Sequence, residues 1–562
     1  MQRLELTWIG KGEDPEVEPR ILIHDPSMDY GDPNTGNMLI HGDNLLALKA
    51  LEQDYAGKIK CIYIDPPFNT GARIDADGNE IGYEDGVEHS IWLNLMAERL
   101  KIMRRLLSED GAIFIHLDDN ESDYCKVLAD EIFGRKNFMN RITIDSRSPS
   151  AFSTVNPGVF KAAEYILFYA KNRSMLVESP VRTKRDPDYA YDKFIVNIDD
   201  EYSQWRYVPL SDAYAQFVEQ ATSARNTKNP KQAADAYNKF IINNAHRIFR
   251  FTAISDKGAG KATVDLKYQS LDTPDTILRL ERQGLDDVYV LNGQQISFYS
   301  KNIVEIDGQK CASRILTDIW SDIAWEGIAS EGGVTFKKGK KPERLIKRCL
   351  ELVTKPGDIV LDSFLGSGTT AAVAHKMHRR YIGIELGPHC YTHSRARLVR
   401  VVDGDQTGIS KIVDWHGGGG FTFYELAPSL ISMDGYGNPV ISASYSAEML
   451  IASVIKLNGY QFSPDNDVFW KQGRGQDKSY IYVTTQYMTA DMLDGIASDM
   501  DPMESLLVCA PAFDLGLNKR YDNITVKKIP QSVLDKCKYG VDNYNLNVVD
   551  LPVCDDEEWE DD

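Results

Sequence analysis

The sequence Ile59-Lys60-Cys61-Ile62-Tyr63-Ile64-Asp65-Pro66-Pro67-Phe68 joins an apolar run to two consecutive prolines. The first six residues predict a buried strand, because the run is short, apolar and rich in isoleucine. Prolines at positions 66 and 67 carry no N–H, so the strand ends there and a rigid turn follows. Asp65 and Phe68 are therefore expected at the carboxyl end of a strand, which is where open α/β sheets bind their ligands.

The segments on both sides of this stretch alternate between apolar runs and helical periodicity. The expected strands are Met38–His41, Gly111–Leu117, Ile359–Leu361 and Tyr381–Ile384, and the expected helices are Ile91–Leu107, Lys341–Val353 and Thr369–Met377. Strands and helices that alternate in this way are typical of an α/β fold with a parallel sheet.

A second motif follows the expected strand at 359–361. It reads Asp362-Ser363-Phe364-Leu365-Gly366-Ser367-Gly368-Thr369, and Glu385 ends the next strand. Glycines between a strand and a helix let a ligand approach the backbone, and an acidic residue about 20 positions later can bind ribose hydroxyls. Asp362 would repel a phosphate, and neither the G-x-G-x-x-G pattern nor a nucleotide P-loop is present. An amino acid attached to a nucleoside fits this pattern better, and that ligand is S-adenosylmethionine. The alternative is a plain strand–glycine turn–helix connection.

The tetrapeptide at 65–68 has the groups that a flipped-out base with an exocyclic amine requires. Asp65 can accept one amino hydrogen, the carbonyl of Pro66 can accept the other, and Phe68 can stack on the ring. By itself, the tetrapeptide is also compatible with a surface turn.

Together, the two motifs resemble those of the amino-methylating DNA methyltransferases. The catalytic tetrapeptide precedes the cofactor loop, an order that resembles the β class of the family, in which the sheet is circularly permuted. Within about Asn37–Leu426, five further segments resemble family motifs: Gly42-Asp43-Asn44-Leu45, His116–Glu121, Asn156–Asn172, Lys341–Leu345 and Gly418–Leu426. The segments at 116–121 and 418–426 are similar to the modification (Mod) subunit of type III restriction–modification systems.

This resemblance implies an enzyme that transfers a methyl group from S-adenosylmethionine to the N6 amine of adenine in double-stranded DNA. D-P-P, in place of S-P-P, resembles the adenine-directed enzymes more than the N4-cytosine ones, and Phe68 keeps the aromatic face of the more usual tyrosine. The implied catalytic residues are Asp65, Pro66, Pro67 and Phe68. The implied cofactor-binding residues are Asp43, Asp65, Lys341, Asp362, Phe364, Gly366, Gly368, Thr369 and Glu385.

Several alternatives stay open. They are an N4-cytosine enzyme, an orphan methyltransferase without a restriction partner, methylation of an amine in RNA or protein, and a DNA-binding module whose cofactor site has decayed. The intact set of Asp362, Gly366, Gly368 and Glu385 argues against the last of these. His389 and His393, beside Cys390, have the helical spacing of zinc ligands, but no remote third ligand is evident, and we expect no metal.

Charge is unevenly distributed along the 562 residues, whose formal net charge is −20. Residues 221–270 carry nine Lys or Arg against three acids and are interleaved with aromatic residues, a composition that suits DNA phosphates and bases. The expected DNA-binding residues of this segment are Lys228, Lys231, Lys239, Arg247 and Arg250. A charge-rich solvated helix is the alternative. The last eight residues carry seven acids, which is typical of a disordered tail.

We therefore expect a circularly permuted Rossmann-like methyltransferase sheet with an inserted target-recognition domain and a small C-terminal α/β domain. The expected parts are an N-terminal extension (1–36), the catalytic half (37–173), the target-recognition domain (174–313), the cofactor-binding half (314–416) and the C-terminal domain (421–562).

The sequence shows no signal peptide, no membrane span and no C-x-x-C pair among its eight cysteines, so we expect a cytoplasmic protein with reduced thiols and no membrane partner. Double-stranded DNA is the expected partner. The sequence leaves open whether the chain forms a homodimer and whether it pairs with a separate restriction subunit that carries helicase and nuclease activities.

Overall fold

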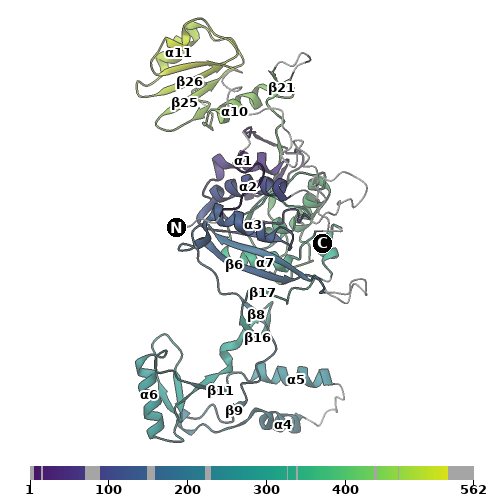
Figure 1. Ribbon diagram of the computed structural model, residues 1–562, viewed down its shortest axis with the longest axis vertical. Helices are drawn as coiled ribbons and strands as arrows, with labels where there is room; N and C mark the ends of the chain where they lie inside the picture. The colour runs from purple at the N-terminus through teal and green to yellow at the C-terminus, as the bar shows by residue number, and fades with distance from the viewer. Residues whose placement is uncertain are drawn as a thin grey trace, which may run out of the picture. The chain divides into compact units, whose positions relative to one another are not determined.

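The computed structural model describes residues 5–529 apart from 14–16, 70–88, 148–158, 222–229, 326, 337–338, 434, 436–438 and 466, and only the backbone of 219–221, 230–233, 433 and 439. The chain forms two compact units, and each is described by itself (Figure 1). Unit 1 comprises Met1–Ser179 and Asp318–Asp562, and unit 2 comprises Pro180–Thr317. The sequence predicts 174–313 for the inserted segment, so the compact insertion begins and ends slightly later.

Unit 1 is built around one large sheet. In spatial order its strands are β1 (Leu22–His24), β20 (Gly420–Leu426), β3 (Met38–His41), β19 (Arg380–Glu385), β18 (Ile359–Asp362), β4 (Ile59–Ile64), β5 (Leu107–Leu117), β7 (Ala163–Ala170), β6 (Phe138–Asp145) and β17 (Ile319–Trp320), while β2 (Tyr30–Gly31) pairs with β20. The strands from β20 to β5 are parallel, and β7 is antiparallel to both of its neighbours.

The order of these strands shows a circular permutation. The pair β18–β19 comes from the second half of the chain, yet it lies between β3 and β4 from the first half. From β18, the chain passes through α8 (Thr369–Lys376) and returns to the sheet as β19, on the side of β3. From β4, it passes through α2 (His89–Leu106) and returns as β5, on the opposite side. The boundary between β18 and β4 is therefore a topological switch point. The predicted fold class, a permuted α/β sheet, is confirmed.

Helices cover both faces of this sheet. Helices α1 (Asn44–Tyr55), α2 and α3 (Ser122–Ala129) lie side by side (Figure 1) and form one core with Ile62 and Ile64. Cys61 and Tyr63 alternate with these isoleucines and are also fully buried, as a strand covered on both faces requires. Helices α7 (Glu343–Val353) and α8 pack against β4, β5, β18 and β19, and α9 (Ala396–Val402) packs against α8.

The structure corrects three predicted boundaries. The helix expected at Lys341–Val353 begins at Glu343, because Lys341 precedes Pro342 and a residue before proline avoids helical geometry. Residues 421–426 belong to β20 of the central sheet and not to a C-terminal domain. The N-terminal segment 1–36 contributes β1 and β2, which pair with β20, so it is part of the sheet and not an extension.

The described residues of unit 2 form a six-stranded antiparallel sheet, a three-stranded sheet and three α-helices. The larger sheet runs β10 (Tyr207–Pro209), β9 (Lys193–Ile195), β11 (Ile248–Ala253), β14 (Gln294–Phe298), β13 (Val288–Leu291) and β12 (Leu278–Leu280). The smaller sheet runs β15 (Ile303–Ile306), β16 (Gln309–Ile315) and β8 (Arg182–Lys184), and the helices are α4 (Leu210–Ala221), α5 (Pro230–Asn243) and α6 (Lys261–Asp272). These helices contribute to cores of their own, so the unit has the internal packing of a domain.

The C-terminal part of unit 1 has a second, smaller sheet. Its strands run β23 (Gln461–Phe462), β24 (Gly473–Arg474), β25 (Ser479–Val483), β26 (Ser505–Ala510) and β27 (Ile524–Lys528), and the last three are parallel. Helices α10 (Ala447–Leu457) and α11 (Ala490–Asp499) pack against it, and the hairpin β21 (Ile431–Met433) and β22 (Pro439–Ile441) precedes it. This is the predicted small α/β domain. The acidic tail lies outside the described residues.

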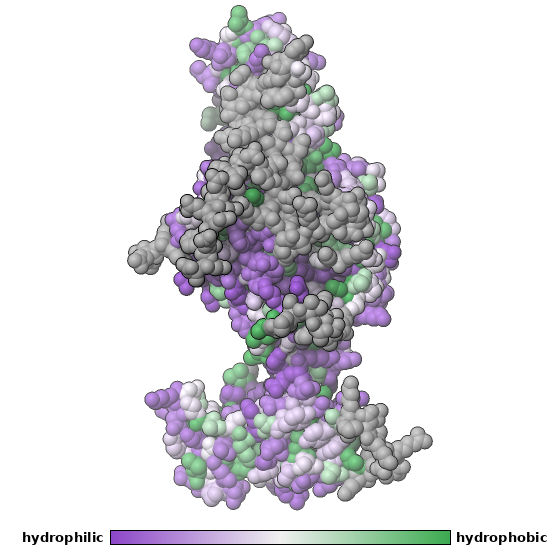
Figure 2. Space-filling view, turned by 45° about the vertical axis from the view of Figure 1, so that its right-hand side comes forward, coloured by the Kyte–Doolittle hydropathy of each residue, from purple (hydrophilic) through white to green (hydrophobic). Residues whose placement is uncertain are grey.

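Among the residues that carry a hydropathy colour in Figure 2, hydrophilic ones are common and hydrophobic ones stand in small groups. Among the described residues, no helix is both long and apolar enough to cross a membrane. The six cysteines that the structure describes are buried thiols.

Candidate active site

Two neighbouring parallel strands bring Asp65 and Asp362 to the same edge of the sheet. Asp362 ends β18, Asp65 follows β4 directly, and the strands pair with Leu361 opposite Ile62. The two predicted motifs, which are far apart in the sequence, therefore meet at the switch point between these strands.

The turn at 65–68 is held in place from α2. The indole N–H of Trp92 donates to the carbonyl oxygen of Pro67 over 2.7 Å. Pro66 is buried, whereas Asp65 and Phe68 are partly exposed, and the ring of Phe68 packs at the margin of the core. The turn thus presents a carboxylate and an aromatic ring on a fixed backbone.

Lys341 and Glu164 lie beside Asp65. The Nζ atom of Lys341 is 3.3 Å from Oδ1 of Asp65 and 3.1 Å from Oε2 of Glu164, and it also lies 4.5 Å from the centroid of the Phe68 ring. On the far side of Glu164, Nε2 of His116 lies 2.8 Å from the same Oε2, and Nδ1 of His116 lies 2.7 Å from the Tyr63 hydroxyl.

This environment shifts the pKa values of the charged groups. Burial raises the pKa of Asp65 above its ordinary value, although Lys341 and His116 act against the shift. Burial alone would also raise the pKa of Glu164, but Lys341 and His116 hold it well below the usual range. Burial alone would lower the pKa of Lys341, but the two carboxylates raise it. Lys341 is therefore a charged group between two carboxylates.

The loop after β18 has the open geometry expected of a ligand-binding turn. Gly366 has φ +53°, and a Cβ atom there would have open space, with the carbonyl oxygen of Phe364 the nearest atom at 4.0 Å. Gly368 has φ +81° and caps α8, and a Cβ atom there would come within 3.1 Å of the backbone of Ser394. The first glycine leaves room beside the loop, and the second permits close packing.

Two carboxylates border this loop. Burial raises the pKa of Asp362 to about 7, and its Oδ1 accepts the N–H of Phe364 over 2.9 Å. Glu385, at the end of β19, accepts the N–H of Gly366 over 2.6 Å and is also paired with His389 over 2.8 Å. Burial raises the pKa of Glu385, but the bonds from His389 and the backbone outweigh this effect and hold it below its ordinary value.

Three predicted cofactor residues have contacts within the protein. Asp43 caps α1 by accepting the N–H groups of Leu45 and Leu46, and Thr369 accepts a hydrogen bond from Arg397 over 2.7 Å. Phe364 is buried in the core. Lys341 lies at the catalytic turn, as described above.

The sequence analysis did not single out Trp92, Glu164 or His116 as site residues. Glu164 and His116 had a detectable signal, because each is a polar residue in an otherwise apolar strand, and buried polar side chains require partners. Trp92 had none, since the apolar face of α2 accounts for it equally well.

A comparison with known protein families identifies the family of this chain. Residues 59–395, more than half of the chain, match a family model described as DNA methylase and named for N6 and N4 methylation. The chain belongs to the DNA methylase family. The matched range includes the turn at 65–68, the glycine loop and Glu385.

The curated relatives of this chain include Mod subunits. It is 37% identical over 416 residues to the probable type III restriction-modification enzyme HindVI Mod subunit of Haemophilus influenzae, covering 70% of this chain and 54% of that protein. It is 26% identical over 423 residues to the EcoP15I Mod subunit of Escherichia coli, covering 67% and 62%. The chain thus spans somewhat more than half the length of these relatives.

Solved structures similar to this chain include the PvuII DNA methyltransferase (cytosine-N4-specific), at 14% identity and a TM-score of 0.31, covering 67% of this chain and 90% of that one. A DNA modification methylase of Thermus thermophilus in complex with S-adenosyl-L-methionine matches at 13% identity and a TM-score of 0.31, covering 69% and 99%.

The predicted DNA-binding residues belong to unit 2. Lys239, on α5, is exposed. Arg247 is paired with Asp199 over 3.1 Å, and the guanidinium of Arg250 lies 4.7 Å from the centroid of the Tyr191 ring. Lys228 and the side chain of Lys231 lie outside the described residues.

The predicted absence of a metal site stays a prediction. His389 is paired with Glu385, and Nε2 of His393 lies 3.1 Å from the carbonyl oxygen of Thr335. Across the described ranges, no group of three or more His, Cys, Asp or Glu side chains is arranged to hold a metal ion.

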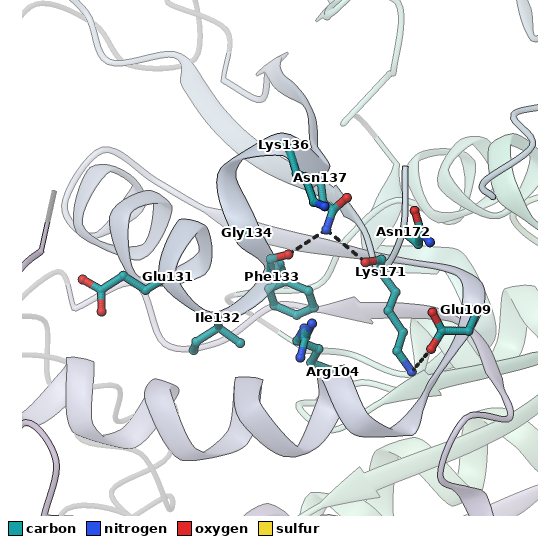
Figure 3. A pocket seen from close by; sticks show the side chains of 10 residues that line it. All are labelled: Arg104, Glu109, Glu131, Ile132, Phe133, Gly134, Lys136, Asn137, Lys171 and Asn172. Atoms are coloured by element: carbon teal, nitrogen blue, oxygen red, sulfur yellow. Dashed lines mark hydrogen bonds and ion pairs between the residues drawn. The ribbon is translucent and has the colours of Figure 1, made fainter. Parts of the chain in front are cut away.

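A pocket of about 420 Å³ lies at the opposite edge of the central sheet (Figure 3). It is lined by Glu109 near the start of β5, by Lys171 just after β7, and by Arg104 near the end of α2. Nζ of Lys171 lies 3.0 Å from Oε1 of Glu109, and Asn137 donates to the carbonyl oxygens of Phe133 and Lys171. Because β4 and β5 are parallel, this edge is remote from the carboxyl ends that carry Asp65. The pocket is therefore separate from the candidate active site.

Proposed function

We propose that the protein transfers a methyl group from S-adenosylmethionine to the N6 amine of adenine in double-stranded DNA. The observation that carries the proposal is the meeting of the turn at 65–68 with the glycine loop after β18 at one switch point. The turn at 65–68 offers hydrogen-bond acceptors for an amine and an aromatic ring on which a base can stack. The glycine loop offers carboxylates and accessible backbone for a nucleoside that carries a zwitterionic amino acid.

The residues around the glycine loop fit that cofactor. Asp362 would bind the ammonium group, since a buried carboxyl whose pKa is raised to about 7 is stabilised in its ionised form by a nearby cation. Glu385 would bind the ribose hydroxyls. The hydroxyl of Ser363 is buried without a hydrogen-bond partner among the described residues, so a polar group of a ligand could satisfy it.

The mechanism that we propose relies on orientation. The bound cofactor supplies an electrophilic methyl group. Asp65 and the carbonyl of Pro66 would accept the two hydrogens of the amine, while Phe68 would stack on the base. Because the nitrogen lone pair of an exocyclic amine is delocalised into the ring, acceptors placed for a tetrahedral nitrogen free that lone pair for in-line attack. Holding the amine in this geometry supplies much of the rate.

Adenine is proposed as the target because the turn contains D-P-P and because the curated relatives include Mod subunits of type III systems. On the same basis, we propose that the chain is the modification component of a restriction–modification system, working with a separate restriction subunit. Unit 2 is proposed to recognise the DNA sequence.

The test is to incubate the protein with methyl-labelled S-adenosylmethionine and double-stranded DNA, and with RNA and protein acceptors in parallel. Digestion of the DNA to nucleosides and mass spectrometry should then show N6-methyladenine. Asp65→Ala should reduce transfer by roughly 10²- to 10³-fold or more, with cofactor affinity retained. Asp110→Ala is the matched control, because Asp110 is paired with Lys60 at the other edge of the sheet.

Other outcomes contradict specific parts of the proposal. N4-methylcytosine in the digest would assign the cytosine reaction, and label in RNA or protein alone would assign another acceptor. Cofactor binding without transfer to any acceptor would indicate a module that has lost catalysis. Near-normal transfer by Asp65→Ala would remove Asp65 from the mechanism.

A further inference from the structure

Lys341 lies between two carboxylates at the catalytic turn. Its Nζ is 3.3 Å from Oδ1 of Asp65 and 3.1 Å from Oε2 of Glu164, and its side chain is 7% exposed. A buried ammonium is stable only where carboxylates or hydrogen-bond acceptors compensate its charge, and here two carboxylates do so.

The backbone directs Lys341 to this position. The residue precedes Pro342, whose φ of −63° and ψ of 136° are extended, so Lys341 stands before α7 and not on its surface. The adjacent Lys340 is also buried, but its Nζ donates to the carbonyl oxygens of Ala329, Glu331 and Val334. Two neighbouring lysines therefore have different tasks: one holds a loop, and the other contacts the catalytic turn.

His116 and Tyr63 lie on the other side of Glu164. Burial raises the pKa of Tyr63 well above its ordinary value, so its hydroxyl stays protonated. This hydroxyl is hydrogen-bonded to Nδ1 of His116 over 2.7 Å. Nε2 of the same ring lies 2.8 Å from Oε2 of Glu164. Glu164 therefore lies between His116 and Lys341, and it accepts a hydrogen bond from Lys341.

We propose that Lys341 is a positioning residue that keeps Asp65 ionised and fixes its orientation, and that Glu164 moderates this effect by sharing the ammonium. This inference rests on the proposed function. An ionised Asp65 offers only acceptors to the amine, whereas protonation turns one of the two carboxyl oxygens into a donor. With Lys341 at Oδ1, the second oxygen, Oδ2, is left for the target amine.

The inference assigns opposite signs to two substitutions. The charged and titratable groups that face Asp65 are Lys341, Glu164, His116, Asp362 and Tyr63. Without the cation, the pKa of Asp65 should rise further, because an attraction that favours the ionised carboxylate is lost. Without the charge of Glu164, the ammonium of Lys341 pairs with Asp65 alone, and the repulsion between the two carboxylates is lost. The pKa of Asp65 should therefore fall.

The experiment measures the single-turnover methylation rate between about pH 5 and 9 with saturating DNA and cofactor. In the wild type, the rate should fall at acid pH as Asp65 becomes protonated. This fall is the acid limb of the pH–rate profile. Lys341→Met should move the acid limb to higher pH, by about 1 unit or more. Glu164→Gln should move it to lower pH, and Lys341→Arg, which keeps the charge, should leave it near the wild-type position. Cofactor affinity, measured by calorimetry, should not change in any of the three.

Lys340→Met is the matched control, because it removes a similarly buried neighbouring lysine whose Nζ donates to three backbone carbonyls. It should lower the melting temperature and leave the acid limb in place. An unchanged acid limb in Lys341→Met would overturn the inference, and so would a loss of cofactor affinity as the sole effect. If Lys341→Met is inactive at every pH, the Glu164→Gln variant provides the test. An acid limb of that variant that stays in place or moves to higher pH would refute the inference. Failure of the proposed function is distinct, since the wild type would then methylate no base in DNA.

Discussion

Glu385 accepts the backbone N–H of Gly366 over 2.6 Å, so the carboxylate at the end of β19 is joined to the glycine loop after β18. The other carboxylate oxygen accepts the N–H groups of Leu386 and Gly387 over 2.8 and 3.2 Å and lies 2.8 Å from Nε2 of His389. One buried side chain thus organises both walls of the proposed cofactor site before any ligand is present. This is the kind of preorganisation that lowers the entropic cost of binding.

Glu385→Gln should weaken cofactor binding and stability together. The amide keeps one acceptor oxygen but loses the charge, and a hydrogen bond to a charged group contributes about 1.5–3 kcal/mol. We therefore expect at least about a tenfold loss of cofactor affinity by calorimetry, with a lower melting temperature. Glu351→Gln, which removes a carboxylate paired with Lys347 on α7, is the control and should change neither. A variant that is less stable but binds the cofactor normally would mean that Glu385 serves the fold alone.

Asp362→Asn should stabilise the ligand-free protein while weakening cofactor binding. Burial raises the pKa of Asp362 to about 7, against about 3.9 in an unfolded chain. As pH rises through this interval, the unfolded chain releases a proton that the folded protein retains, so stability is lost. The melting temperature of the variant should therefore exceed that of the wild type at pH 8, and the gap should shrink towards pH 4.

Cofactor affinity gives the second measurement on Asp362. The wild type should bind more tightly as pH rises from about 6 to 8, because an ammonium group pairs with the ionised carboxylate. Asp362→Asn should bind weakly, with no such rise. Equal affinity of the two proteins at pH 8 would contradict the proposed contact with the ammonium.

The strands at the centre of the sheet were predictable because their sequences are local signals. Ile59–Ile64 and Ile359–Asp362 are apolar runs ended by polar turns, and the structure has them as β4 and β18. β20 was missed because Gly417–Gly420 suggests a linker, although Phe421 and Phe423 alternate with polar positions and are fully buried. A run of glycines permits a turn but does not determine which sheet the following strand joins.

The place of Lys341 could not be predicted from its motif. The motif gives a lysine before a proline and a helix, and the resemblance assigns it to the cofactor. Its contacts with Asp65 and Glu164 depend on how three segments far apart in sequence pack around one sheet. Long-range side-chain proximity of this kind has no periodic signal in a single sequence.

His389 should contribute stability that depends on pH. Burial lowers its pKa, but Glu385 outweighs burial and raises the pKa above the ordinary value of 6.5. The stabilisation is then present below about pH 6.5 and is lost as pH rises through the folded-state pKa. His389→Gln should therefore lower the melting temperature more at pH 6 than at pH 9.

His416→Gln is the control for this effect, since its partner Asp414 is exposed and surface pairs contribute little. A chelator such as EDTA should leave the melting temperature and the methyl transfer unchanged. A marked loss of either on chelation would instead support the zinc site that His389 and His393 resemble in spacing.

Lys239 and Arg247 should contact DNA phosphates, whereas Arg250 should act mainly in the fold of unit 2. Lys239 is exposed, and Arg247 can leave Asp199 because surface ion pairs are worth about 0–1 kcal/mol. The partly buried guanidinium of Arg250 packs on Tyr191. Replacing Lys239 and Arg247 together by Gln should weaken DNA binding and reduce the slope of log K against log salt by about 2, since each lost phosphate contact lowers it by about 0.9. Arg250→Gln should lower the melting temperature instead.

Two further variants test the direction of the predicted effect on DNA binding. Asp199→Asn removes a competing anion from Arg247 and should strengthen DNA binding, the opposite of the double variant. Lys301→Gln removes a half-exposed cation of the same unit that lies outside the basic segment, and it should leave the salt slope unchanged. Cofactor affinity should be the same in all of these proteins, because the proposed cofactor residues belong to unit 1. If the salt slope is unchanged in the double variant, the basic segment does not contact phosphates, and exchange of residues 180–317 for those of a relative should then fail to change the methylated sequence.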